Sequence, residues 1–347
     1  MPELNRRSFL GTGLATSLAA GAAFAASPEG GKPSSKHELP YNPRTHAAMP
    51  TRNLGRTGYR VGILSLGGQA TLEIPGKEAQ SEAILHRAID LGVNYIDSAA
   101  GYGQGTSEKN IGPVLKTRRK EVFVTSKTAD RTYDGSMRLL DSTLKNMQTD
   151  HLNLWQIHNL QTKAQLEQIF APDGAMKALE KAKSEGMAMF LGVTGHFEPN
   201  VLLAAIDRFP FDTILMAINA ADRHYLSFQE HLLPTALAKH MGTISMKVAT
   251  RGRMLSTWTP PPTEQQPANM RTALPGAITI EEALAYNLSL PVSTTIIGVD
   301  TVEQIEKNVA LASKFTPLSE AEIKAIEKRT LPIVRQALYF RRWDLGA

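Results

Sequence analysis

The sequence predicts an α/β fold, a (β/α)8 TIM barrel with a β-hairpin in front of it and a long loop after the seventh strand. Eight short runs of β-branched and apolar residues alternate with helix-length spacers, which is the pattern of parallel βα units. Each run is apolar almost throughout, as expected for strands buried on both faces. The predicted strands are 61–67, 93–98, 121–127, 152–158, 187–195, 212–219, 242–248 and 293–299.

The segments between these runs support the same fold. Residues 51–61 hold two glycines at turn spacing, which predicts a short hairpin that closes the barrel floor. Residues 81–92 and 134–148 place apolar side chains on one helical face. The proline-rich stretch 255–277 has no period and predicts a loop that covers the barrel mouth. The alternative, an open doubly wound sheet, is disfavoured because no GxGxxG motif follows the first strand.

Composition excludes several classes of protein. The chain has 347 residues and no cysteine, so it forms no disulfide, thiolate metal site or iron–sulfur cluster. The net charge is +5, but the 38 basic and 33 acidic residues are interspersed, and no nucleic-acid surface is expected. No metal site is predicted, because the candidate ligands do not cluster. No apolar stretch is long enough to span a membrane.

The N-terminus has the layout of an export signal. Arg6 and Arg7 precede a stretch of small residues that ends in an Ala-Phe-Ala cleavage pattern, so cleavage is expected near Ala25. The paired arginines resemble a twin-arginine signal, which implies the twin-arginine export machinery as a partner and a periplasmic location. Residues 1–25 are thus predicted as signal peptide, 26–50 as a flexible linker and 51–347 as the barrel domain. The alternative for the first segment is an uncleaved amphipathic helix.

Four polar side chains stand at or just beyond the ends of successive strands: Asp97, Tyr102, Lys127 and His158. Each alone has an ordinary explanation, as a cap, a surface residue or a core histidine. Consecutive barrel strands converge on one opening, however, so the four are expected to meet. Tyrosine would act as proton donor, an ammonium beside it would favour its ionised form, and a carboxylate would keep that ammonium charged. Such a set suits protonation of an oxygen while hydride reaches carbon.

The stretch that begins at Asp97, DSAAGYGQGTSEKNIGPVLK, resembles the Asp-x-x-x-x-Tyr-Gly-x-x-Ser-Glu signature of the aldo-keto reductase superfamily. LGRTGYRVGILSLGG near the front and IIGVDTVEQIEKN near the end are similar to other segments of the family. The resemblance covers nearly all of residues 51–330. It implies that Asp97, Tyr102, Lys127 and His158 form the catalytic tetrad and that the cofactor is NAD(P)(H).

The resemblance also implies where the nucleotide binds. The implied cofactor contacts are Gly67, Gly68, Thr194, Asn219, Lys247, Gly298, Asp300, Gln304 and Asn308. The family's Ser-Asn after the fifth strand is replaced here by Thr194-Gly195-His196, so His196 is an extra titratable group near the mouth. Asp300 would repel a 2′-phosphate and accept a bond from a free 2′-hydroxyl, which favours NAD(H).

The expected function is interconversion of a carbonyl (aldehyde, ketone or sugar) and an alcohol, with Tyr102 as general acid/base. A periplasmic enzyme has little free nicotinamide nucleotide around it, so the nucleotide is expected to be exported with the protein and to stay bound. One alternative is a conventional soluble NADPH-dependent reductase of aldehydes and ketones. Another is a nucleotide-binding, redox-sensing subunit without turnover. A substrate pocket made of Trp155, Trp258, Arg223 and His224 is also possible.

Overall fold

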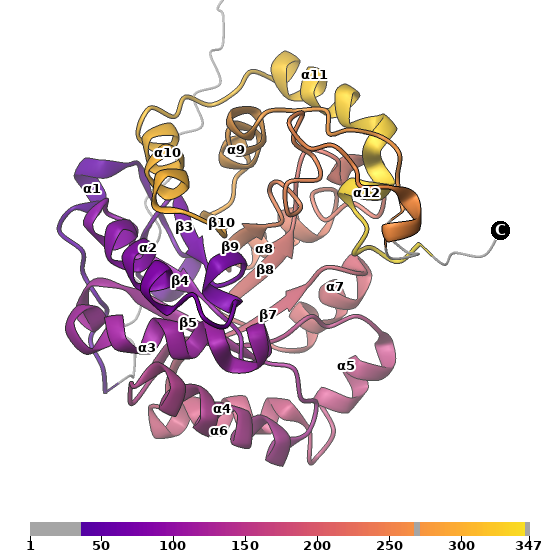
Figure 1. Cartoon of the computed structure of the whole chain (residues 1–347). Coiled ribbons are helices and arrows are strands. Elements are labelled where there is room, and N and C mark those ends of the chain that lie inside the picture. The colour runs from indigo at the N-terminus through magenta and orange to yellow at the C-terminus, as the bar shows by residue number, and fades with distance from the viewer. Residues whose placement is uncertain (1–35, 267–270, 344–347) are drawn as a thin grey trace, which may run out of the picture. The chain divides into compact units, whose positions relative to one another are not determined.

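The computed structural model describes residues 36–266 and 271–343. In this part of the chain, eight parallel strands form a closed barrel in the order β10-β3-β4-β5-β6-β7-β8-β9, with helices around it (Figure 1). The predicted (β/α)8 barrel is therefore confirmed. The barrel strands are β3 (Leu64–Gly67), β4 (Tyr95–Asp97), β5 (Phe123–Thr128), β6 (Leu152–Ile157), β7 (Ala188–Gly195), β8 (Thr213–Ala217), β9 (Gly242–Met246) and β10 (Thr294–Ile297).

Helices follow the strands and cover the outside of the barrel. Several begin at a capping side chain: Thr132 accepts the Gly135 amide, and Thr279 and Ser319 each form a capping box. Their apolar faces pack on the outer side of the strands in one large core. The main helices are α2 (Glu78–Asp90), α3 (Thr106–Arg118), α4 (Tyr133–Met147), α5 (Lys163–Ile169), α6 (Ala175–Glu185), α7 (Pro199–Arg208), α8 (Leu232–Ala238), α9 (Ile280–Ser289), α10 (Val302–Ser313) and α11 (Glu320–Thr330).

A β-hairpin closes the floor of the barrel, as predicted. Strands β1 (Thr51–Asn53) and β2 (Arg60–Gly62) pair antiparallel, and Leu54 and Tyr59 contribute to the inner core. The first predicted strand, 61–67, therefore spans two elements, because β2 ends before β3 begins. Gly55 has φ +53°, and a Cβ there would lie 2.1 Å from the Gly242 amide nitrogen. The hairpin turn thus rests directly on the start of β9.

The second half of the predicted linker is not a free tether. Residues 40–50 pack against the barrel and include a short helix, α1 (Thr45–Ala48). The Asn42 amide donates to the Ile89 and Val93 carbonyls, and the Thr45 hydroxyl donates to the Gly92 carbonyl. The prediction of a flexible linker is therefore wrong for these residues. Its basis was the absence of an apolar period, whereas polar side chains bonded to the end of α2 hold this segment. The predicted signal peptide, residues 1–25, lies outside the described residues.

Two long segments lie near the C-terminal ends of the strands. The predicted loop follows β9, and its described residues contain only one short helix, η6 (Thr263–Gln265). The chain end folds into η8 (Leu331–Ile333) and α12 (Val334–Ala337), and the fully buried Arg341 pairs there with Asp222. Within the described ranges, no helix combines the length and apolarity that a membrane crossing requires.

Candidate active site

Asp97 and Lys127 form a buried ion pair at the ends of neighbouring strands. Asp97 ends β4 and lies opposite Thr125 of β5, so that Lys127, two residues further on, points over the same edge. The Lys127 Nζ atom lies 2.5 Å from Asp97 Oδ2 and also donates to the Ser98 carbonyl at 2.6 Å. Thr125 Oγ1 donates to the other carboxylate oxygen at 2.9 Å. Both ionised groups are therefore partnered, which burial of charge requires.

Tyr102 and His158 lie beside this pair. Tyr102 opens η3 (Tyr102–Gly105), directly after the β4 turn, and its ring centroid is 5.0 Å from Lys127 Nζ. His158 follows β6, and its ring meets the tyrosine ring edge-on at a centroid distance of 5.7 Å. The turn depends on Gly103, whose φ is +55° and whose Cβ would lie 2.1 Å from the Glu73 carbonyl oxygen. The structure thus brings together all four side chains that the sequence singled out.

The electrostatics of Tyr102 differ from the expectation. Burial raises the pKa of Tyr102 well above 10, and the nearby Asp97 carboxylate raises it further. The sequence argument expected the Lys127 ammonium to favour the ionised phenol. In the resting site, burial and the Asp97 carboxylate outweigh that effect, because the ammonium is itself buried and paired with Asp97. Tyr102 is therefore a neutral phenol that carries a proton to give.

His158 is a neutral imidazole. Burial lowers its pKa to about 3, and the cationic groups of Lys127, Arg131 and Lys247 add to the effect. With that pKa, the charge of the His158 ring does not change between pH 5 and 8. The neutral ring has one donor nitrogen and one acceptor nitrogen. Such a ring can orient a carbonyl oxygen but does not compete with Tyr102 as an acid at neutral pH.

A cavity of about 750 Å³ runs from Asp97 and Tyr102 to the start of α10. This volume is within the usual range of cofactor sites, about 300–1,000 Å³. Seven of the nine predicted cofactor residues line the cavity: Gly67, Gly68, Lys247, Gly298, Asp300, Gln304 and Asn308. A Cβ on Gly68 would lie 2.6 Å from the Asp97 carbonyl oxygen, so the approach of β4 already requires glycine there.

Two contacts join residues that line this cavity but lie far apart in the chain. Lys247 Nζ donates to Gln69 Oε1 at 3.0 Å, and Arg251 pairs with Glu73 at 3.1 Å. We call these two contacts the cross-cleft strap. They join η2 (Ala70–Glu73) to the chain after β9, and sequence reasoning missed Gln69, Glu73 and Arg251. Each pair is separated by 178 residues, so no local pattern could reveal it.

Of the two cations in the strap, Arg251 pairs with a carboxylate and Lys247 does not. No carboxylate within the described ranges forms an ion pair with it. Burial lowers the pKa of Lys247 to about 8, and the positive charges of Arg251 and Lys127 contribute. Its φ of +65° is strained for a residue with a side chain. A desolvated ammonium of this kind is suited to an anionic ligand.

At the far end of the cavity, the predicted adenosine contacts are tied to one another. Gln304 Oε1 accepts the Asp300 amide at 2.7 Å, and the Asp300 carbonyl accepts bonds from Thr71 and Gln80. The Asp300 carboxylate makes no ion pair with any described residue and is exposed. Lys307, which could neutralise that carboxylate, instead pairs with Glu281 at 2.7 Å.

Two predicted cofactor contacts lie outside the cavity. Asn219 is fully buried, and its amide donates to Lys247 O, Thr250 Oγ1 and Ala337 O while it accepts the Ala221 amide. Thr194 is also buried, and its hydroxyl oxygen accepts the Asn159 amide at 2.8 Å. Both residues hold the loops around the mouth together. The supposed sugar pocket is not formed either, because Trp155 belongs to the outer core and His224 bonds the Glu327 carbonyl.

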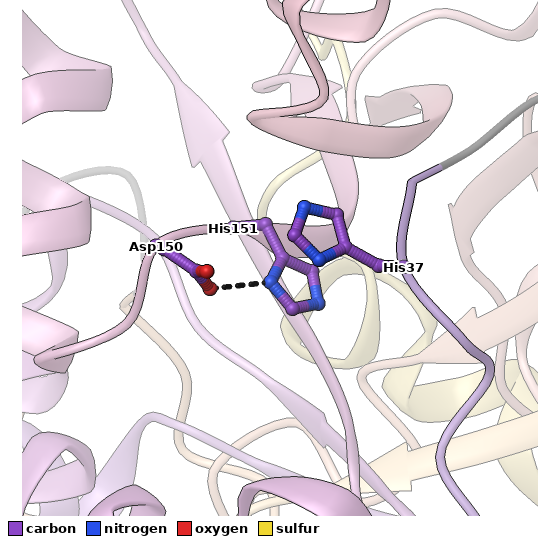
Figure 2. A group of neighbouring side chains, drawn as sticks. All are labelled: His37, Asp150 and His151. Carbon is purple, nitrogen blue, oxygen red and sulfur yellow. Dashed lines mark hydrogen bonds and ion pairs between the residues drawn. The ribbon is translucent and has the colours of Figure 1, made fainter.

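Figure 2 shows a second group of titratable side chains, His37, Asp150 and His151. His151 precedes β6, whereas His158 follows the other end of that strand. The imidazoles of His37 and His151 stack with ring centroids 3.6 Å apart and only 9° between their planes. Metal-binding lone pairs lie in the ring plane, and those of two stacked rings do not converge on one ion. His151 Nδ1 pairs with Asp150, and His37 Nε2 bonds the Gly186 carbonyl. The stack fastens residue 37 to the barrel.

Fold and site together define a class of protein: a closed parallel barrel in which a tyrosine, beside a buried Asp–Lys ion pair, lines a cavity large enough for a cofactor. The model of the aldo/keto reductase family matches residues 61–330. An uncharacterized oxidoreductase of Bacillus subtilis, YqkF, is 24% identical in an alignment of 311 positions that covers 81% of this chain and 97% of that protein. L-galactose dehydrogenase of Arabidopsis thaliana is 27% identical in an alignment of 291 positions that covers 77% of this chain and 89% of that enzyme.

Among solved structures, the holo form of an aldo-keto reductase from Bacillus halodurans superposes with a TM-score of 0.66 at 25% identity. The match covers 81% of this chain and 96% of that one. The chain therefore belongs to the aldo/keto reductase family. It is an NAD(P)-dependent oxidoreductase that acts on carbonyl and alcohol groups.

Proposed function

We propose that this protein interconverts a small carbonyl compound (an aldehyde, a ketone or a sugar) and its alcohol, with Tyr102 as the general acid/base. The observation that carries the proposal is that Tyr102, which lines the cavity together with Asp97, lies beside Lys127 and His158. A nicotinamide nucleotide bound there supplies or accepts hydride. The site fits such a group, since the cavity has the required size and Lys247 presents a cation without a carboxylate.

Each side chain has a separate task in this proposal. The Tyr102 hydroxyl donates its proton to the carbonyl oxygen, and the raised pKa keeps that proton in place until negative charge develops. Asp97 fixes the Lys127 ammonium below the tyrosine ring, where the positive charge stabilises the phenolate left behind. His158 orients the carbonyl oxygen. In the alcohol-oxidising direction the same groups run in reverse.

We propose that the nucleotide is NAD(H), because the exposed Asp300 carboxylate lines the end of the cavity where the resemblance implies the adenosine half, and it would repel a 2′-phosphate there. Replacement of Asp300 by serine should therefore raise the affinity for NADP(H) about tenfold and change that for NAD(H) less, since like charges repel. Fluorescence titration of both nucleotides measures the two affinities. Glu303→Ser removes a nearby carboxylate that does not line the cavity, so it serves as control. Equal effects of the two variants would refute the assignment.

Lys247 is proposed to bind the pyrophosphate, and its pKa of about 8 gives the binding a pH dependence. The ammonium is charged below that pKa and loses its proton above it, so the nucleotide dissociation constant should rise about tenfold between pH 7 and 9.5. Lys247→Met should bind weakly at both pH values. Lys247→Arg keeps its charge throughout and should show no such rise. Identical pH profiles of the wild type and the arginine variant would exclude Lys247 from the anion site.

We also propose that the protein is exported by the twin-arginine route and works in the periplasm with a nucleotide that does not dissociate between turnovers. The leader sequence supports export, and the cross-cleft strap supports retention, since its two contacts tie together lining residues from two distant segments. A single site would then oxidise one substrate and reduce another with the same nucleotide.

Retention is tested on protein isolated from the periplasm of its native host. Gel filtration followed by heat release should yield about one nucleotide per chain, detected by absorbance, and turnover should need no added cofactor. Folded protein without nucleotide, active only when NAD(P)H is supplied, would support the conventional exchangeable reductase instead. A screen of sugars and small aldehydes on the same material identifies the substrate.

A further inference from the structure

A second histidine, His196, lies near His158, Lys127 and Lys247 and has no part in the mechanism proposed above. His196 follows β7, the strand next to β6, which His158 follows. Its Nδ1 atom lies 2.9 Å from Oδ1 of Asn159, the residue directly after His158. The two imidazoles thus stand on neighbouring strand ends and are joined through one asparagine.

That contact fixes which His196 nitrogen carries the proton. The amide oxygen of Asn159 only accepts hydrogen bonds, so Nδ1 of His196 must donate. In a neutral imidazole the other nitrogen then holds a lone pair. The ring is neutral, because burial and the nearby cations of Lys247 and Arg341 lower its pKa well below 6.5. His196 Nε2 is therefore an obligate acceptor.

The support behind His196 is rigid. Asn159 has φ +51°, a left-handed conformation, and its backbone N–H donates to Thr194 Oγ1 on β7. The other side of the imidazole meets the Phe340 ring edge-on, with centroids 5.9 Å apart. Arg341 Nη1 donates to the His196 carbonyl at 2.7 Å. Two contacts thus hold the ring and one holds its backbone, while its Nε2 atom bonds no described residue.

We propose that His196 Nε2 accepts a hydrogen bond from a substrate hydroxyl on the carbon next to the reacting carbonyl. The inference rests on the proposed function, since Tyr102 and His158 must hold the carbonyl oxygen. Tyr102 and His158 bind the carbonyl oxygen of the substrate. His196 follows the next strand, so its acceptor nitrogen favours a substrate that has a hydroxyl on the adjacent carbon. The substrate class is accordingly the α-hydroxy carbonyl compounds, which include sugars, rather than simple aldehydes.

The test compares 2-hydroxypropanal with propanal, which differ only in that hydroxyl. The wild type should prefer the hydroxylated substrate by kcat/KM, and His196→Phe, which keeps an aromatic ring against Phe340, should reduce the ratio at least tenfold. His196→Gln, which offers an amide oxygen, should restore part of it. Both aldehydes are partly hydrated in water, but this affects the ratio of the two kcat/KM values equally in every variant, so it cancels when the ratios are compared. His46→Phe, an exposed histidine on α1, should leave the ratio unchanged.

The outcomes separate the inference from the function on which it rests. Propanal reduction with no preference for the hydroxylated substrate overturns the role of His196 and leaves the proposed function intact. A His196→Phe variant that binds nucleotide more weakly at an unchanged ratio also overturns it, and assigns the imidazole to the nucleotide. Failure of the wild type to reduce either aldehyde with nucleotide bound overturns both.

Discussion

Replacement of Tyr102 by phenylalanine is expected to lower kcat by a factor of about 10²–10⁴ and to leave the nucleotide dissociation constant within about twofold. The ring stays beside Lys127 and His158, so the packing is kept, but the proton donor is gone. Neither neighbour replaces it, because His158 has a pKa of about 3 and Lys127 is bound to Asp97. Single-turnover absorbance at the nicotinamide measures the rate directly.

The matched control is Tyr41→Phe, which removes a hydroxyl from an exposed tyrosine. That variant should turn over at the wild-type rate. A Tyr102→Phe enzyme that keeps more than about half of its turnover would refute the assigned proton donor. Loss of nucleotide binding along with turnover would point instead to a binding role. A wild-type protein that binds the nucleotide but turns over none of the substrates would instead indicate a redox-sensing subunit.

The second large effect concerns the buried ion pair. Asp97→Leu leaves the Lys127 ammonium buried without its counter-charge and should cost about 3–5 kcal/mol of unfolding free energy. Burial already lowers the pKa of Lys127, and loss of the carboxylate lowers it further, so turnover should fall as well. Lys127→Met should also destabilise the protein, because a carboxylate then stands alone.

The double variant Asp97→Leu/Lys127→Met separates stability from catalysis. Replacement of both ions by apolar groups of similar size should restore most of the unfolding free energy, yet turnover should stay lost. Denaturant unfolding and single-turnover rates give the two quantities on the same samples. A double variant that recovers turnover would mean that the pair is only structural. A single variant with unchanged stability would contradict the burial of the pair.

The barrel could be predicted from sequence because its signals are local and repeated. Each strand is a short apolar run, and the four tetrad residues stand at strand ends that a closed barrel must bring together. The family signature after Asp97 fixes the tyrosine position as well. The same locality explains the errors: β2 and β3 read as one strand because both are apolar, and only hairpin pairing separates them.

What the sequence could not predict depends on contacts between distant residues. Asn42 and Thr45 form hydrogen bonds with the end of α2, and Glu73 forms an ion pair with Arg251. No sequence motif or regular spacing predicts either set of contacts. The neutral state of Tyr102 follows from its loss of water contacts and from the Asp97 carboxylate beside it, which no strand pattern predicts. Asn219 has the residue type of a carboxamide ligand, but its four hydrogen bonds are already made within the fold.

The central claim, hydride transfer to a carbonyl carbon beside Tyr102, is tested most directly with a reduced nucleotide deuterated at C4 of the nicotinamide. The protein carrying that nucleotide is mixed with an α-hydroxy aldehyde, and the product is analysed by mass spectrometry and NMR. The account predicts one deuterium on the new carbinol carbon in the wild type and none within the same time in Tyr102→Phe. Nucleotide bound in full, with no deuterium transferred to any carbonyl compound tested, would contradict it.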